Sequence, residues 1–133
     1  MKVSPSTLRL AFALFALAAA PVAAHHAMGT LFDLTRTVTV TGSITRVEWT
    51  NPHSYISVDV KGAGGDVQHW LFELAGASVL QHAGLTSADR GLKPGEAVTV
   101  DAFAARDGTP VGFVNKLRLA DGRVFLPASA AGR

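Results

Sequence analysis

Alternation of polar and apolar residues along the chain predicts a series of short β-strands. In the segment Thr37–Trp49 (TVTVTGSITRVEW) every second position up to Ile44 is apolar or glycine, and the apolar series then resumes out of phase at Val47. Side chains of a strand alternate between its two faces, so such a change of phase requires an extra residue. We therefore predict a β-bulge or a sharp bend near Thr45–Arg46.

Further segments complete the pattern. Asn51-Pro52 ends the first strand, because proline has no N–H for the sheet. Gly84 and Pro94-Gly95 mark a helix end and a turn. Strands are predicted at 55–60, 67–74, 96–103 and 111–119, a short tail strand at 123–126, and a short helix at 75–83.

The order of these elements indicates a fold class. Three strands, a short helix and two more strands follow one another as in the OB-fold, a small, partly open five-stranded barrel. We therefore expect an all-β protein with one short helix, built as an OB-like five-stranded β-barrel. Another small β-barrel and a two-layer sandwich are the alternatives. Alternation in the third strand directs one set of side chains to the core, namely Trp70, Phe72 and Leu74, and another to solvent, namely His69, Leu71 and Glu73.

The first 24 residues have the three parts of a secretory signal peptide. A basic start with Lys2 and Arg9 precedes the apolar run Leu10–Ala20, and small residues follow at Val22-Ala23-Ala24. A membrane-spanning helix needs about 20 apolar residues, so this run is too short to be an anchor. We predict cleavage after Ala24 and a periplasmic or secreted mature chain with no stable membrane anchor.

The predicted organisation has four parts. They are a signal peptide at 1–24, an N-terminal arm at 25–36, the β-barrel domain at 37–126 and a flexible tail at 127–133. Removing Lys2 and Arg9 from the twelve basic residues leaves ten, which balance the ten acidic residues. A neutral chain with no basic run is not typical of a nucleic-acid-binding protein. Cysteine is absent, so the core, alone or with a bound metal, must stabilise the fold.

Five histidines provide the candidate chemistry, and all of them follow the predicted cleavage site. Cleavage would make His25 the N-terminal residue, whose α-amine and imidazole can chelate one metal ion. Both groups lose protons near neutral pH. A third nitrogen would complete the ligand set of histidine-brace copper sites, and nitrogen ligands favour Cu(II). His53, in the WTNPH kink, is the preferred third ligand, and His26 can join only if the terminus turns.

Other interpretations of these residues stay open. His25 and His26 can form a polar overhang, and His53 can cap a turn through its ring nitrogens. His69 and His82 are expected on the surface. Glu73 can either be solvated on the outer face, which we favour, or orient a metal-bound histidine from the second coordination shell, and Asn51 is a further second-shell candidate. Aromatic residues of the strands, namely Trp49, Tyr55, Trp70 and Phe72, can pack in the core or stack on an extended ligand.

Several motifs together resemble a known family. These are HHAM after the cleavage site, VTGSITRVEWTNPHSYISVDV, WLFEL, LKPGEAVTVDAF with RDGT, and LADGR. They are similar to small exported bacterial proteins that are grouped as a domain of unknown function, with HHS or HHA at the mature N-terminus, WTNPH and a Trp-x-x-Glu strand. The family pattern matches His25, His26, Trp49, Asn51, Pro52, His53, Trp70 and Glu73. The resemblance implies a periplasmic or secreted β-rich single domain, and it implies no activity.

Our leading hypothesis is a periplasmic copper-binding module with His25, His26 and His53 as ligands. Standard catalytic motifs are missing, which favours copper handling over catalysis. One alternative is an OB-like interaction module that binds an envelope protein or an extended envelope ligand through the NPH loop. The other alternative is an oxidative copper enzyme with an open coordination position.

Overall fold

The computed structural model describes residues 28–87 and 92–127. The chain divides into two units, residues 1–31 and residues 32–133. In the first unit, residues 28–31 form a single helical turn. The predicted signal peptide, His25, His26 and the tail after Pro127 lie outside the described residues. No helix within the described ranges is long and apolar enough to cross a membrane.

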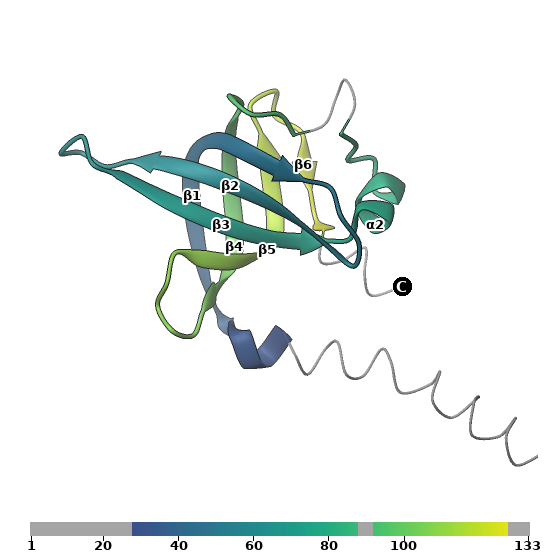
Figure 1. Cartoon of the computed structure of the whole chain (residues 1–133), viewed down its shortest axis with the longest axis horizontal. Helices are drawn as coiled ribbons and strands as arrows, with labels where there is room; N and C mark the ends of the chain where they lie inside the picture. The colour runs from purple at the N-terminus through teal and green to yellow at the C-terminus, as the bar shows by residue number, and fades with distance from the viewer. Residues whose placement is uncertain (1–27, 88–91, 128–133) are drawn as a thin grey trace, which may run out of the picture. The chain divides into compact units, whose positions relative to one another are not determined.

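The described part of the second unit consists of six strands and one short helix (Figure 1). In chain order these elements are β1 (Phe32–Glu48), β2 (His53–Lys61), β3 (Val67–Ala75), α2 (Ala77–His82), β4 (Ala97–Ala105), β5 (Val111–Leu119) and β6 (Val124–Phe125). The predicted order of three strands, a helix and two strands is therefore confirmed, together with the short tail strand. The fold is mostly β.

Five of the strands form a ring. The sheet order is β3-β2-β1-β4-β5-β6, in which each strand is antiparallel to the next, and β3 also pairs with β5. This additional pairing is parallel and joins Leu71–Glu73 to Val111–Phe113. The strands therefore close in the order β1-β2-β3-β5-β4, and Figure 1 shows them wrapped around a common interior.

The long strand β1 belongs to two parts of the ring. It pairs with β4 from Phe32 to Ser43, and with β2 from Ser43 to Glu48. The register with β2 shifts between Ile44 and Arg46, which confirms the predicted bulge. At the crossing point a Cβ atom on Gly42 would lie 2.3 Å from the carbonyl oxygen of Asp59, so only glycine allows this close approach.

The first strand begins at Phe32, five residues before the predicted start at Thr37. Residues 32–36, which we expected in an N-terminal arm, are therefore part of the sheet. The register with β4 is irregular between Asp33 and Thr37, and the Asp33 carboxylate accepts hydrogen bonds from the backbone N–H and the hydroxyl of Thr35. This local turn interrupts the alternation on which the prediction depended.

The interior of the ring is filled by branched and aromatic side chains. Phe72 and Leu74 are buried as predicted, and Trp70 is half-buried against the core with its ring stacked on Phe72 at a centroid distance of 5.4 Å. The neighbouring His69 and Leu71 are exposed, so the predicted alternation of β3 is correct for these residues. The largest core side chains include Ile44, Ile56, Leu80, Val100 and Leu117.

Helix α2 follows β3 directly and is shorter than predicted. The strand continues to Ala75, so the helix begins at Ala77 and ends at His82, and its Leu80 packs in the core. Gly84 has φ +83°, the left-handed conformation that terminates many helices, as the sequence predicts.

Candidate functional site

The candidate site lies at the kink between β1 and β2. Residues 49–52 connect the two strands, the Asn51–Pro52 peptide bond is cis, and His53 is the first residue of β2. His53 is followed by Ser54, which faces the interior, so the ring of His53 points to the outer side of the sheet. The kink thus presents His53 at the end of a strand, as the sequence indicates.

His53 contacts Glu73 of the neighbouring strand. Nδ1 of His53 lies against Oε1 of Glu73, and the two side chains are 41% and 15% exposed. A neutral imidazole that donates its Nδ1–H to a carboxylate keeps the lone pair of Nε2 free. The same arrangement orients histidines that bind metals through Nε2. We favoured a solvated position for Glu73 on the outer face, whereas its carboxylate is largely buried and contacts His53.

Glu73 lies between two neighbouring strands, β2 and β5. Its Cα partners are Tyr55 in β2 and Phe113 in β5, so it lies where the parallel pairing closes the ring. Burial raises the pKa of the Tyr55 phenol, and the charges of Glu73 and Glu48 raise it further. Tyr55 is therefore a neutral phenol at physiological pH.

Asn51, the other second-shell candidate, joins the kink to α2 by hydrogen bonds to Ser78. Its Oδ1 accepts a hydrogen bond from the Ser78 backbone N–H, and its Nδ2 donates to the Ser78 hydroxyl, both at 3.2 Å. Gly76, which precedes α2, provides no side-chain cap for the helix. Asn51 thus caps the helix from a different element.

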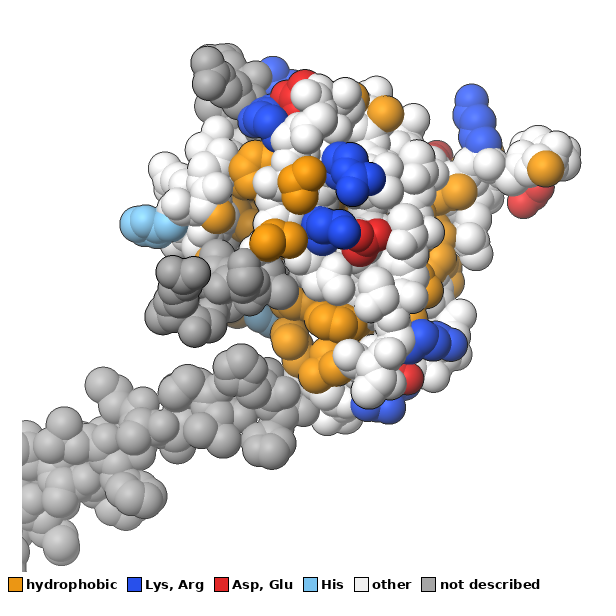
Figure 2. All heavy atoms as spheres, turned by 180° about the vertical axis from the view of Figure 1, so that it is seen from behind, with side chains coloured by type: hydrophobic (Ala, Val, Ile, Leu, Met, Phe, Trp, Pro, Cys, Tyr) orange, Lys and Arg blue, Asp and Glu red, His pale blue; other side chains and the backbone are white. Residues whose placement is uncertain are grey.

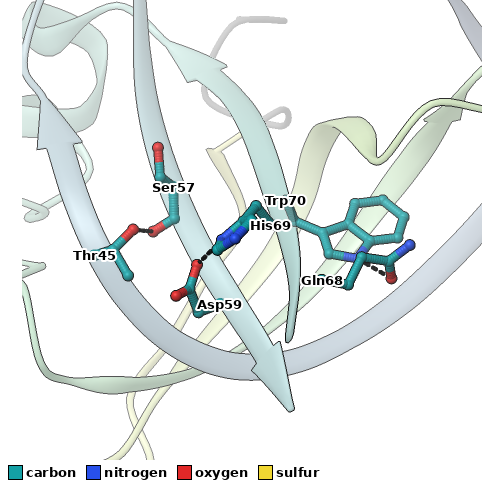
Figure 3. Close-up of polar contacts among 6 residues, drawn as sticks. All are labelled: Thr45, Ser57, Asp59, Gln68, His69 and Trp70. Atoms are coloured by element: carbon teal, nitrogen blue, oxygen red, sulfur yellow. Dashed lines mark hydrogen bonds and ion pairs between the residues drawn. The ribbon is translucent and has the colours of Figure 1, made fainter. Parts of the chain in front are cut away.

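A second histidine and carboxylate pair lies on the same hairpin, towards its tip (Figure 3). Nδ1 of His69 is 2.6 Å from Oδ1 of Asp59, its direct cross-strand partner. His69 is 76% exposed, which confirms its predicted surface position. His82 is also exposed, in the last turn of α2.

The described residues contain only part of the predicted ligand set. Of His25, His26 and His53, the structure describes His53 alone. Within residues 28–87 and 92–127, no group of three or more His, Cys, Asp or Glu side chains is close enough to hold a metal ion.

Sequence reasoning missed the polar residues that support the kink. Thr50 and Ser54 hydrogen-bond to each other, and Ser78 binds Asn51. The pairing of His69 with Asp59 could have been predicted from the sequence. A hairpin turn at Gly62–Asp66 makes these two residues direct cross-strand partners. No comparable pattern relates Asn51 to Ser78, which is 27 residues away.

The surface carries charges of both signs. On the face shown in Figure 2, Lys and Arg side chains are scattered among acidic and apolar side chains and do not gather into one continuous patch. A hollow of about 130 Å³ with a mixed polar and apolar lining lies between the kink and α2, lined by Trp49, Ala77, Gln81, Leu85, Thr86 and Ser87.

Comparison with known proteins gives one result that bears on identity. No curated protein matches the chain. A family model described as a family of unknown function, DUF6152, matches residues 13–115, which span most of the chain and include the kink, Glu73 and all five strands of the ring in whole or part. The chain therefore belongs to the DUF6152 family, as the resemblance to a domain of unknown function implies.

Proposed function

We propose that the mature chain begins at His25 and binds one copper ion outside the cytoplasm. The ligands are the α-amine and ring of His25, Nε2 of His53, and His26 either as a fourth ligand or as an outer contact. Residues 1–24 serve as a cleaved signal peptide, and the five-stranded ring is an OB-like barrel that carries the site. The protein handles copper rather than catalysing a reaction.

One observation carries the proposal, namely the contact between His53 Nδ1 and Glu73 Oε1. A histidine that binds a metal almost always donates its other ring N–H to a carboxylate, a carbonyl or water. Glu73 is largely buried, which makes its carboxylate a fixed acceptor, while the His53 side chain is partly exposed and uses only Nδ1 in this contact.

The donor set supports copper over other divalent ions. It would consist of an amine and two or three imidazoles, which are nitrogen donors without thiolate or multiple carboxylates. Cu(II) has the highest affinity of the first-row divalent ions for such donors and accepts a tetragonal arrangement. Glu73 would remain in the second shell, where it would fix the tautomer of His53.

The test is a Cu(II) titration of the chain that begins at His25, followed by calorimetry and electron paramagnetic resonance. Three matched chains accompany it: one with an extra N-terminal alanine, His53→Ala, and His69→Ala. The last changes a histidine on the same hairpin that also pairs with a carboxylate.

We expect one-to-one binding with nitrogen couplings in the starting chain and in His69→Ala. The alanine-extended chain and His53→Ala should bind at least about tenfold more weakly, because each loses part of the ligand set. Equal, weak binding by all four chains would refute the proposal. Loss of binding in the extended chain alone would exclude His53 as a ligand.

A further inference from the structure

Ser54 directly follows the candidate ligand His53. Among the described residues it is the only polar residue that is buried, with 2% of its surface exposed. Its hydroxyl donates a hydrogen bond to the carbonyl oxygen of Thr50 at 3.1 Å and accepts one from the Thr50 N–H at 3.3 Å. We refer to these two bonds as the Thr50–Ser54 clamp. The clamp closes the loop of residues 50–54, which contains His53.

Thr50 also holds His53 directly. Its hydroxyl donates a hydrogen bond to the carbonyl oxygen of His53. The backbone at His53 is thus held at its own carbonyl and, through Ser54, at the following residue. A fixed backbone restricts the orientations of its side chain, and the ring of His53 meets Glu73 in one of them.

The clamp is attached to α2 by three further contacts. The Thr50 carbonyl oxygen accepts a second hydrogen bond, from the Ala77 N–H at 2.9 Å, and Asn51 binds Ser78. Between these contacts a Cβ atom on Gly76 would lie 2.6 Å from both Asn51 Oδ1 and the Pro52 carbonyl oxygen. The kink and the start of α2 therefore pack with no space for another side chain.

We infer that Ser54 is a positioning residue for His53: the Thr50–Ser54 clamp sets the backbone so that Nδ1 meets Glu73 and Nε2 faces outward. Removal of this buried hydroxyl is costly, because the Thr50 N–H loses its partner and the Thr50 carbonyl oxygen keeps only its bond from Ala77. The inference concerns the metal-free chain, and it rests on the proposed function only for its effect on copper affinity.

The experiment uses the chain that begins at His25 and three variants. Ser54→Ala removes the clamp at almost unchanged volume, Ser54→Thr keeps the hydroxyl, and Thr50→Val removes the bond to the His53 carbonyl at an exposed position. Ring ¹⁵N chemical shifts of the histidines are recorded without metal at a pH where the imidazoles are neutral. His69 serves as an internal control because its pairing with Asp59 lies away from the kink.

In the unchanged chain we expect His53 to carry its proton on Nδ1. In Ser54→Ala and Thr50→Val the His53 shifts should move towards a mixture of tautomers, while the His69 shifts stay unchanged and circular dichroism shows an intact fold. Ser54→Thr should retain the original His53 signature. Copper affinity should fall by about tenfold in Ser54→Ala.

The possible failures are distinguishable. Unchanged His53 shifts in Ser54→Ala and Thr50→Val would overturn the positioning role, whatever the copper affinity. Shifts that change equally at His53 and His69 would also overturn it, because they would indicate general destabilisation. A specific change at His53 in a chain that binds no copper would support the positioning role and refute the proposed function.

Discussion

Glu73 contacts His53 across two neighbouring strands, although the direct Cα partner of His53 is Ala75. The pair is therefore diagonal, and it spans the strand end at which the kink enters the sheet. Residues two positions apart on one face of paired strands are within reach of long side chains. This geometry places a largely buried carboxylate against one ring nitrogen only.

Replacement of this carboxylate tests the role assigned to it. Glu73→Gln keeps the size of the side chain but removes the charge and adds an amide donor, so it favours the Nδ1–H tautomer of His53 less strongly. We expect copper affinity to fall by about 10- to 100-fold, the usual effect of losing such a partner. Calorimetric titration measures the change. Asp59→Asn, the equivalent change at His69, is the control, and an equal loss in both variants would contradict the assignment.

The Asp101 carboxylate is expected to make folding stability depend on pH. It accepts a hydrogen bond from the Thr39 hydroxyl and is 2.7 Å from Lys116 Nζ, and these contacts lower its pKa, with Lys116 the largest cause. A pKa that is lower in the folded state stabilises the protein above the unfolded value, near 3.9, and the contribution is lost as the pH falls through the folded value.

Asp101→Asn should therefore destabilise the protein by about 1 kcal/mol at pH 7, and by progressively less below about pH 4. Urea unfolding between pH 2 and pH 7 measures both effects. Glu48→Gln is the control, because its ion pair with Arg46 is exposed and should contribute less. A pH-independent difference between Asp101→Asn and the unchanged chain would refute the electrostatic explanation.

Gly42 should tolerate no side chain. The 2.3 Å approach of a Cβ atom to the Asp59 carbonyl oxygen would force β1 and β2 apart, so Gly42→Ala should cost about 2 kcal/mol or more. At Gly64, in the hairpin turn, the nearest atom would be at 3.4 Å, an ordinary contact, and Gly64→Ala should be almost neutral. Thermal unfolding compares the two variants, and similar melting temperatures would show that β1 can move away from Asp59.

Export should produce a chain that begins at His25. Intact-mass measurement of the exported protein is expected to give the mass of residues 25–133, because the small residues up to Ala24 fit the signal peptidase. Ala24→Arg should prevent or displace this cleavage. A mature chain that begins at any other residue would remove the amine ligand of His25 from the proposed site.

Local patterns in the sequence determined most of the elements. The alternation of β3, the bulge after Ile44, the glycine at position 84 and the bounds of β5 follow from neighbouring residues, because side-chain periodicity and backbone preferences act over a few positions. The same reasoning failed at residues 32–36, where the Asp33 turn interrupts the alternation although the strand continues.

Only the tertiary structure decided which strands close the ring and what surrounds His53. The parallel pairing of β3 with β5 joins residues about 40 positions apart, and Asn51 meets Ser78 across another long separation. Such contacts depend on register and on the packing of the whole core, which no short segment encodes. The residue types around the kink indicated metal chemistry, whereas the partnership of His53 with Glu73 and the clamp by Ser54 required the folded chain.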